Sequence, residues 1–204
     1  MQAREPILNT SRLVLASASP RRARLLSQIG LTFEVCPSDV VEPPHSAFSN
    51  EHGQEITQEL ALLKARAVAQ HYSEGVIIGA DTLVSLNRRL LGKPVDDADA
   101  ITMLTQLSGT AHEVITGVAL VNASTARTVV WAETTQVYFR RLHRTEIADY
   151  VATGEAADKA GAYGIQERGA AFVNRIEGCY FNVVGLPLAS FVEHLSNFQS
   201  DVGT

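Results

Sequence analysis

The 204-residue sequence lacks long apolar runs. Stretches such as 76–78 and 118–121 are far shorter than the roughly 20 residues that cross a bilayer, and residues 1–11 hold no apolar core of a secretory signal. Seven prolines and 14 glycines are too few for a fibrous or low-complexity protein. We therefore expect a globular, cytoplasmic protein without a membrane partner.

Cysteine and positive charge are also scarce. The two cysteines, Cys36 and Cys179, cannot form a metal knuckle by themselves, and a disulfide between them is not expected without an export signal. Lys and Arg total 17 against 22 Asp and Glu, which leaves a net charge of −5. Bulk attraction to nucleic acid is therefore not expected, and an anionic ligand requires a local cluster of cations.

Several common catalytic motifs are missing as well. Gly92-Lys93 is followed by Pro94 rather than by the Ser or Thr of a Walker loop, and no Gly-x-Gly-x-x-Gly or Gly-x-Ser-x-Gly sequence occurs. His112 and Glu113 begin a zinc-protease motif, but its second histidine is absent. The usual kinase, dehydrogenase, hydrolase and zinc-protease interpretations lose their main support.

Hydrophobic patterning predicts an α/β fold in one domain over residues 1–204. Strands are expected over 13–16, 33–36, 76–78, 114–121, 128–139, 172–176 and 180–184, with 114–139 forming a hairpin and Gly79 ending the third strand. Helices are expected over 20–29 and 54–70, and from about 97, 145 and 187. Their predicted inward faces include Ile29 in the first helix and Ile56, Leu60, Leu63 and Ala67 in the second, with Thr145 as a cap.

The segment 17–22 places hydroxyls and guanidiniums where a strand enters a helix. Ser17 and Ser19 precede Pro20, a favoured first helical residue, and Arg21 and Arg22 follow. Free backbone N–H groups at a helix start, together with two arginines, can hold phosphate. The alternative is a plain capped helix with solvated arginines.

A second candidate is Asp81, in the sequence Gly-Ala-Asp-Thr over 79–82. An acid at the carboxyl end of a buried strand can hold a divalent cation or accept a proton from water. The alternative is a turn that merely ends the strand. Lys93, held before a proline a dozen residues later, adds a cation that favours the ligand site.

The remaining polar candidates are weaker alone. Lys64 flanks the apolar face of the second helix, where lysines commonly only extend to solvent, and Glu42 lies in a Pro- and Ser-rich loop over 37–53. The segment 154–166 is a dense polar loop that includes Lys159 and Gln166, whose amide can bind a base edge. A structural loop is the alternative there.

Taken in order, these pieces resemble the Maf family of nucleoside triphosphate pyrophosphatases over about 13–198. The matching segments are 15–22, 64–65, 79–82, 92–94, 108–117, 158–166 and 184–187. The resemblance implies a fold like that of inosine triphosphate pyrophosphatases, with an elongated, twisted mixed sheet, flanking helices and two lobes around a central cleft. It also implies cleavage between the α and β phosphates with Mg²⁺ or Mn²⁺.

The resemblance further assigns roles to individual residues. It implies that Asp81 is the general base, that Glu42, Lys64 and Lys93 line the catalytic site, and that Asp81 and Glu42 hold the metal; whether Asp81 is base, ligand or both stays open. The residues implied to bind substrate are Ser17, Ser19, Arg21, Arg22, Thr82, Lys159 and Gln166, with Arg22, Thr82 and Gln166 tied to substrate choice.

The details favour one branch of the family. Thr82 and Gln166 resemble the branch that acts on dTTP and UTP, whereas Ala156 and Glu167 depart from the residues common in the family. The leading hypothesis is an enzyme that removes dTTP, UTP and modified pyrimidine nucleotides, with a small nucleotide as partner and a homodimer left open. The alternative is a non-catalytic nucleotide-binding regulator of cell division, which would need the cations but no base.

Overall fold

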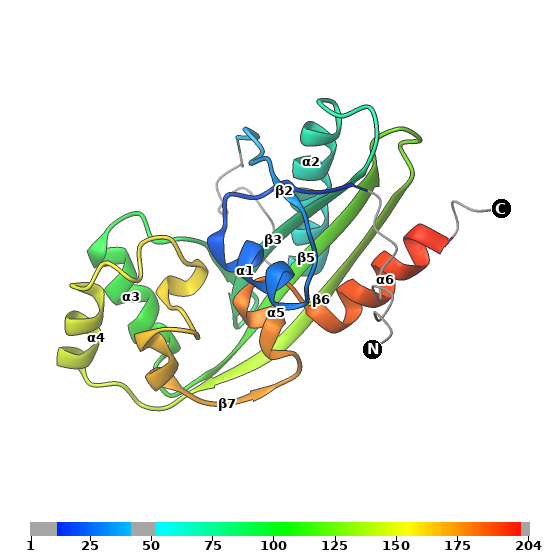
Figure 1. The fold of residues 1–204 in the computed structure, drawn as a ribbon. Coiled ribbons are helices and arrows are strands. Elements are labelled where there is room, and N and C mark those ends of the chain that lie inside the picture. The colour runs from blue at the N-terminus through cyan, green and yellow to red at the C-terminus, as the bar shows by residue number, and fades with distance from the viewer. Residues whose placement is uncertain (1–11, 42–51, 201–204) are drawn as a thin grey trace, which may run out of the picture.

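A computed structural model of the chain describes residues 12–41 and 52–200 (Figure 1). In chain order the elements are β1 (Leu13–Leu15), α1 (Pro20–Gln28), β2 (Glu34–Val35), α2 (Gly53–Ala69), β3 (Val76–Leu86), β4 (Arg89–Leu91), α3 (Asp97–Leu107), β5 (Ala111–Asn122), β6 (Thr128–Phe139), α4 (Arg144–Val151), the 3₁₀ turns η2 (Ala160–Ala162) and η3 (Arg168–Phe172), β7 (Val173–Glu177), α5 (Tyr180–Val184) and α6 (Leu188–Ser200). Among the described helices, none is long and apolar enough to span a membrane.

The strands form one seven-stranded mixed sheet in the order β2-β1-β3-β5-β6-β7, with β4 paired to β3. β1 is parallel to β2 and β3, whereas all other pairs are antiparallel. The predicted hairpin is the long pair β5–β6, which twists across the molecule beside β3 (Figure 1). The α/β class with a mixed, helix-flanked sheet is confirmed, while the likeness to inosine triphosphate pyrophosphatases stays a prediction.

Helix α2 packs closely on the sheet because two strands carry glycine where it crosses them. A Cβ on Gly79 of β3 would lie 2.1 Å from the carbonyl oxygen of Ala61. A Cβ on Gly117 of β5 would lie 2.2 Å from the carbonyl carbon of Thr57. This contact turns the small side chains of α2 inward, so the prediction that Leu63 is buried is wrong: it is 46% exposed.

Strand β3 is longer than the sequence predicts. The expected end at Gly79 is wrong, because β5 pairs with β3 continuously from Val76–Asn122 to Ser85–Glu113. The glycine serves the close approach of α2 instead of a turn. Asp81 therefore lies within the strand rather than at its carboxyl end.

The segment 180–184 is the short helix α5, not the predicted strand. Gly178 has φ 120° and turns the chain before it, and Gly185 has φ 126° and ends it. The side chain of buried Asn182 donates from Nδ2 to the Val114 carbonyl and to Thr135 Oγ1. A side chain, not a backbone ladder, thus fastens this segment to the sheet.

Three smaller predictions also differ from the structure. Ile29 follows the last turn of α1 and is 36% exposed, and Ala67 is only half-buried. Thr145 lies inside α4 rather than capping it. The N-cap is His143, whose backbone N–H donates to the Glu146 carboxylate. The helix therefore begins at Arg144, before the predicted cap.

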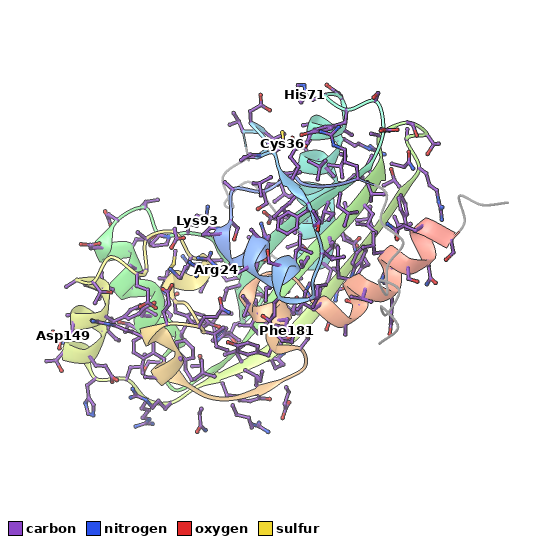
Figure 2. The ribbon with its side chains drawn as sticks, in the orientation of Figure 1. Arg24, Cys36, His71, Lys93, Asp149 and Phe181 are labelled. Carbon is purple, nitrogen blue, oxygen red and sulfur yellow. The ribbon has the colours of Figure 1, made fainter. Side chains whose placement is uncertain are left out.

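Two apolar cores lie toward opposite ends of the long strands. One packs α1 and α6 on the sheet around Phe191 and Phe198, and the other packs α3 and α4 around Leu104 and Phe172. Figure 2 shows Lys93 between these two parts of the molecule. Polar side chains line the space between the two cores, whereas the division into two lobes around a central cleft stays a prediction.

Candidate active site

A cavity of about 310 Å³ lies between the two cores. Its walls come from the turn after β1, from α2 and β3, from the segment after β4, and from the loop before η3. The predicted site residues that line it are Ser17, Ser19, Arg21, Arg22, Lys64, Asp81, Thr82, Lys93, Lys159 and Gln166. Glu42, predicted to join them, lies outside the described residues.

The turn between β1 and α1 organises one wall. Ser19 occupies the N-cap position of α1 without a side-chain capping bond. Ser17 Oγ instead accepts hydrogen bonds from the Ser19 backbone N–H at 3.2 Å and from Arg22 Nη1 at 3.0 Å. With both lone pairs engaged, the Ser17 hydroxyl can still donate its hydrogen, which suits an anionic ligand.

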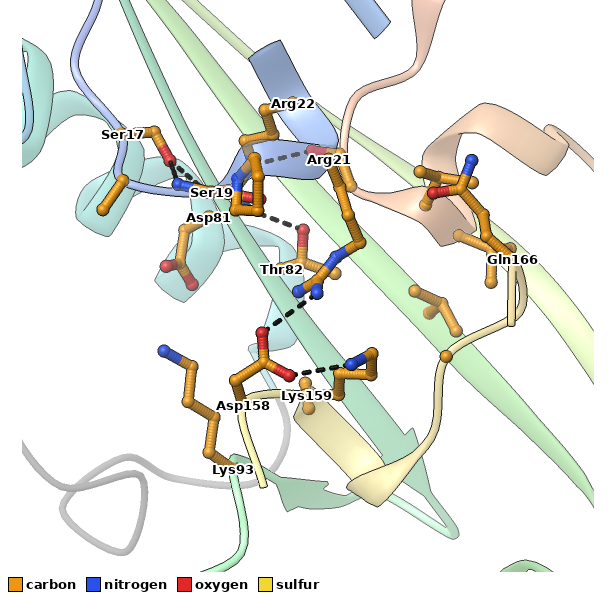
Figure 3. A pocket seen from close by; sticks show the side chains of 18 of the residues that line it. Ser17, Ser19, Arg21, Arg22, Asp81, Thr82, Lys93, Asp158, Lys159 and Gln166 are labelled. Carbon is orange, nitrogen blue, oxygen red and sulfur yellow. Dashed lines mark hydrogen bonds and ion pairs between the residues drawn. The ribbon is translucent and has the colours of Figure 1, made fainter. Parts of the chain in front are cut away.

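Arg22 is held from several directions. Besides Ser17, its Nε donates to the Gly185 carbonyl at 2.9 Å and its Nη2 to Thr82 Oγ1 at 3.0 Å (Figure 3). From the sequence, Gly185 was included only within the matching segment 184–187, and there was no signal for Ser38, another residue of the wall. These partners come from the turn after β1, from β3 and from the end of α5, so only the fold could reveal them.

Asp81 and Lys64 form a buried ion pair. Lys64 Nζ of α2 lies 2.5 Å from Asp81 Oδ1, and the two side chains are 12% and 8% exposed. Gly79 faces α2, and because side chains alternate along a strand, Asp81 faces the same helix. On the edge of β3 opposite β5, the pairing with β1 ends at Ile78 and the pairing with β4 begins at Val84. The part of β3 that holds Asp81 therefore has no neighbouring strand on this edge.

The second oxygen of Asp81 is suited to bind a ligand. Asp81 Oδ2 is buried and has no hydrogen-bond partner among the described residues. A buried carboxylate oxygen requires a partner, and a water molecule or a hard cation can supply it.

The loop over 154–166 supplies the facing wall. Arg21 Nη1 donates to Asp158 Oδ2 at 3.1 Å, and Lys159 Nζ donates to Asp158 Oδ1 at 2.8 Å and to the Glu155 carbonyl at 2.7 Å. Burial alone raises the pKa of Asp158, but the hydrogen bonds from Lys159 and Arg21 outweigh it and hold that pKa below its ordinary value. Asp158 is therefore an anion that joins α1 to the loop.

Lys93 and Gln166 lie on opposite sides of the cavity (Figure 3). Both are exposed, and neither makes a hydrogen bond or ion pair with a described residue. Of the two departures from the family pattern, Ala156 is buried in the α3–α4 core. Glu167 lies at the cavity, 3.7 Å from the Lys159 ammonium.

A buried aromatic pair supports this wall from behind. His112 Nε2 lies 2.9 Å from the hydroxyl of Tyr163, a cavity residue. His112 thus has a polar partner in Tyr163. Burial lowers the pKa of His112 to about 4 and raises that of Tyr163, so both groups are neutral near pH 7.

The depressed pKa of His112 predicts an acid-sensitive fold. The unfolded chain binds this proton below about pH 6.5 and the folded chain only below about 4, so stability falls as pH drops between these values, by up to about 3 kcal/mol. Urea unfolding at several pH values, compared with His112→Gln, measures the effect. Equal pH dependence in the two proteins would contradict it.

The described residues contain no group of three or more His, Cys, Asp or Glu side chains placed to hold a metal ion. Asp81, with its unpartnered buried oxygen, nevertheless fits the way Mg²⁺ is bound at phosphate sites, by one or two carboxylates together with substrate oxygens and water. Asp81 therefore fits a metal ion that binds to the protein and to the substrate at the same time.

Comparisons with known proteins agree with this geometry. The family model described as Maf-like protein matches residues 12–198. The chain is 49% identical over 190 residues to a dTTP/UTP pyrophosphatase of Pelotomaculum thermopropionicum, covering 93% of this chain and 98% of that one. It is 48% identical over 191 residues to a protein of the same name from Bacillus mycoides, covering 94% and 97%.

Proposed function

The chain belongs to the Maf family, and on that premise we propose that it is a nucleoside triphosphate pyrophosphatase that hydrolyses dTTP, UTP and modified pyrimidine nucleotides to monophosphate and pyrophosphate. The observation that carries the proposal is Asp81, whose buried carboxylate has an oxygen without a partner among the described residues, in a cavity lined by cations. A non-catalytic regulator would need the cations but no such carboxylate, so this alternative is not favoured.

The charges of the cavity suit a metal-bound triphosphate. Among the described residues, five cationic and three acidic side chains line it, and five less three leave a net formal charge of +2. A triphosphate carries about four negative charges, which these side chains balance only by half. One divalent cation would supply the remaining positive charge and, when bound, would stabilise charge on the phosphate oxygens.

Asp81 is placed to accept a proton. Lys64 holds Oδ1, which leaves Oδ2 to receive a hydrogen bond from water. As the water oxygen bonds to the α-phosphorus, its proton passes to the carboxylate and the bond from phosphorus to the α–β bridging oxygen breaks. Pyrophosphate leaves, and the Ser17 hydroxyl, Arg22 and Lys93 hold phosphate oxygens.

Pyrophosphate release measured over a panel of nucleoside triphosphates tests this function. We expect dTTP and UTP to exceed CTP and the purine nucleotides in kcat/KM, with monophosphate formed in equal amount to pyrophosphate. Nucleotide binding without release, or release of orthophosphate alone, would refute the proposal.

Removal of divalent metal should abolish turnover. The described carboxylates are too few to hold a metal ion by themselves, so we expect the metal to bind together with the substrate. Excess chelator is therefore expected to reduce kcat to background, and added Mg²⁺ or Mn²⁺ should restore it. Turnover at full rate in chelator would show that the side chains alone suffice.

Gln166 should contribute to base choice. Its exposed amide has no described partner and offers a donor and an acceptor to a pyrimidine edge. Gln166→Ala is expected to lower the preference for UTP over CTP by about threefold to tenfold, the worth of one hydrogen bond, while CTP turnover stays nearly constant. Arg168→Ala, an exposed neighbour outside the cavity, is the control; equal losses on both nucleotides would contradict a role in selection.

Several broader predictions remain proposals of the same kind. They are a single domain over 1–204, a cytoplasmic location, a homodimer, and participation of Glu42 in catalysis and metal binding.

A further inference from the structure

Thr82 and Thr116 form a chain of hydrogen bonds behind Arg22. They are paired residues on β3 and β5, and their hydroxyl oxygens lie 3.0 Å apart. Arg22 Nη2 lies 3.0 Å from Thr82 Oγ1, and Thr116 Oγ1 lies 3.0 Å from the carbonyl oxygen of Asn182. Thr116 is 0% exposed, and Thr82 reaches the cavity wall (Figure 3).

The direction of this chain follows from its two ends. A carbonyl oxygen only accepts, so Thr116 must donate its single hydrogen to Asn182. Thr116 can then only accept from Thr82, which spends the hydrogen of Thr82. A guanidinium only donates, so Arg22 donates to Thr82.

We propose that Thr116 is a positioning residue that makes Thr82 a hydrogen-bond acceptor at the cavity wall and thereby favours bases that present an N–H group. One lone pair of Thr82 Oγ1 binds Arg22, and the other receives no hydrogen bond from the described residues. The inference rests on the proposed function, of which it explains the base preference.

Pyrimidine chemistry gives this polarity a consequence. Uracil and thymine carry a hydrogen on N3, whereas N3 of cytosine is an acceptor. An acceptor-only hydroxyl can bind the first two bases and faces the lone pair of the third. A site built for one hydrogen-bonding pattern rejects the opposite pattern strongly, because buried polar groups are left unpaired.

Thr116→Val tests the role of Thr116 with almost no change of volume. Valine cannot accept a hydrogen bond, so Thr82 regains a free hydrogen and can rotate to donate. We expect the ratio of kcat/KM for UTP to that for CTP to fall about threefold to tenfold, with much of the change in KM. Thr116→Ser, which keeps the hydroxyl, should restore the ratio.

Thr57→Val is the matched control. Thr57 is also 0% exposed, but its hydroxyl donates to backbone carbonyls within α2, at Gly53 and Gln54. The UTP/CTP ratio should stay at the wild-type value in this variant. An unchanged ratio in Thr116→Val, or an equal fall in Thr57→Val, overturns the proposal.

Two further measurements keep the test decisive. Thr82→Val combined with Thr116→Val should lower the ratio no more than Thr82→Val alone, because Thr116 acts through Thr82. Additive losses in the double variant would count against the proposal.

Thermal unfolding is recorded for every variant. If Thr116→Val does not fold, Thr116→Ala replaces it with the same expectation. A wild-type protein that hydrolyses no triphosphate would refute the proposed function itself, whereas an active Thr116→Val with the wild-type ratio refutes only this role.

Discussion

Asp81→Asn is expected to lower kcat by at least about a hundredfold while the protein stays folded. Asparagine keeps the size of the side chain but cannot accept the proton that the attacking water loses, and a positioned general base is worth roughly 10²–10⁴-fold. Oδ1 is already engaged by Lys64, so the unpartnered Oδ2 is the atom whose basicity the substitution removes. Any contribution of this oxygen to metal binding adds to the loss.

The measurement is kcat for dTTP beside nucleotide affinity and thermal unfolding. Affinity should remain, because Arg21, Arg22 and Lys93 also line the cavity, and we expect these cations to bind phosphate without the help of Asp81. Asp158→Asn is the matched control, since this carboxylate also lines the cavity but is bound by Arg21 and Lys159 through both oxygens. Near-normal turnover in Asp81→Asn would place the base elsewhere, with Glu42 as the next candidate.

Gly117→Ala should destabilise the fold by more than about 3 kcal/mol, the upper end of the usual cost of overpacking. The added Cβ would lie 2.2 Å from the carbonyl carbon of Thr57 and 2.5 Å from the Gln58 nitrogen, both backbone atoms that cannot rotate away. Helix α2 must then move off the sheet. It carries Lys64, so the ion pair with Asp81 is disturbed, and kcat of the remaining folded protein should fall as well.

Urea unfolding and kcat of Gly117→Ala measure the two effects. Gly154→Ala provides the contrast, because a Cβ there meets nothing within 4 Å and only its φ of 78° is unfavourable, which costs about 1–2 kcal/mol. If Gly117→Ala were no more destabilising than Gly154→Ala, close packing of α2 would not be what holds this site together.

Local patterns predicted most of the regular elements. The apolar run of β1 and the Ser-Pro start of α1 depend on neighbours in sequence, and the structure has both. An aspartate cap of α3 was also predicted, at Asp96 or Asp97, and the structure places it at Asp96. The site residues were predicted from the order of the motifs along the chain, which does not depend on where each residue lies in its strand or helix. Every one of them among the described residues lines the cavity.

Predictions were wrong where a distant segment decided the outcome. Gly79 has the local character of a strand end, yet β5 continues to pair with β3 beyond it and α2 needs its missing side chain. The segment 180–184 has the composition of a strand but forms α5, because the Asn182 side chain binds Val114 and Thr135 on the sheet.

The sequence by itself determined the α/β class, the family and the identity of the polar residues. Only the tertiary structure decided which of them meet: Lys64 with Asp81, Arg21 with Asp158, and Arg22 with Thr82 and Thr116. The physical reason is range. Propensities, caps and hydrophobic periodicity act within a few residues, whereas ion pairs and hydrogen bonds need atoms within about 3 Å, and for residues far apart in sequence only the packed sheet and helices supply that distance.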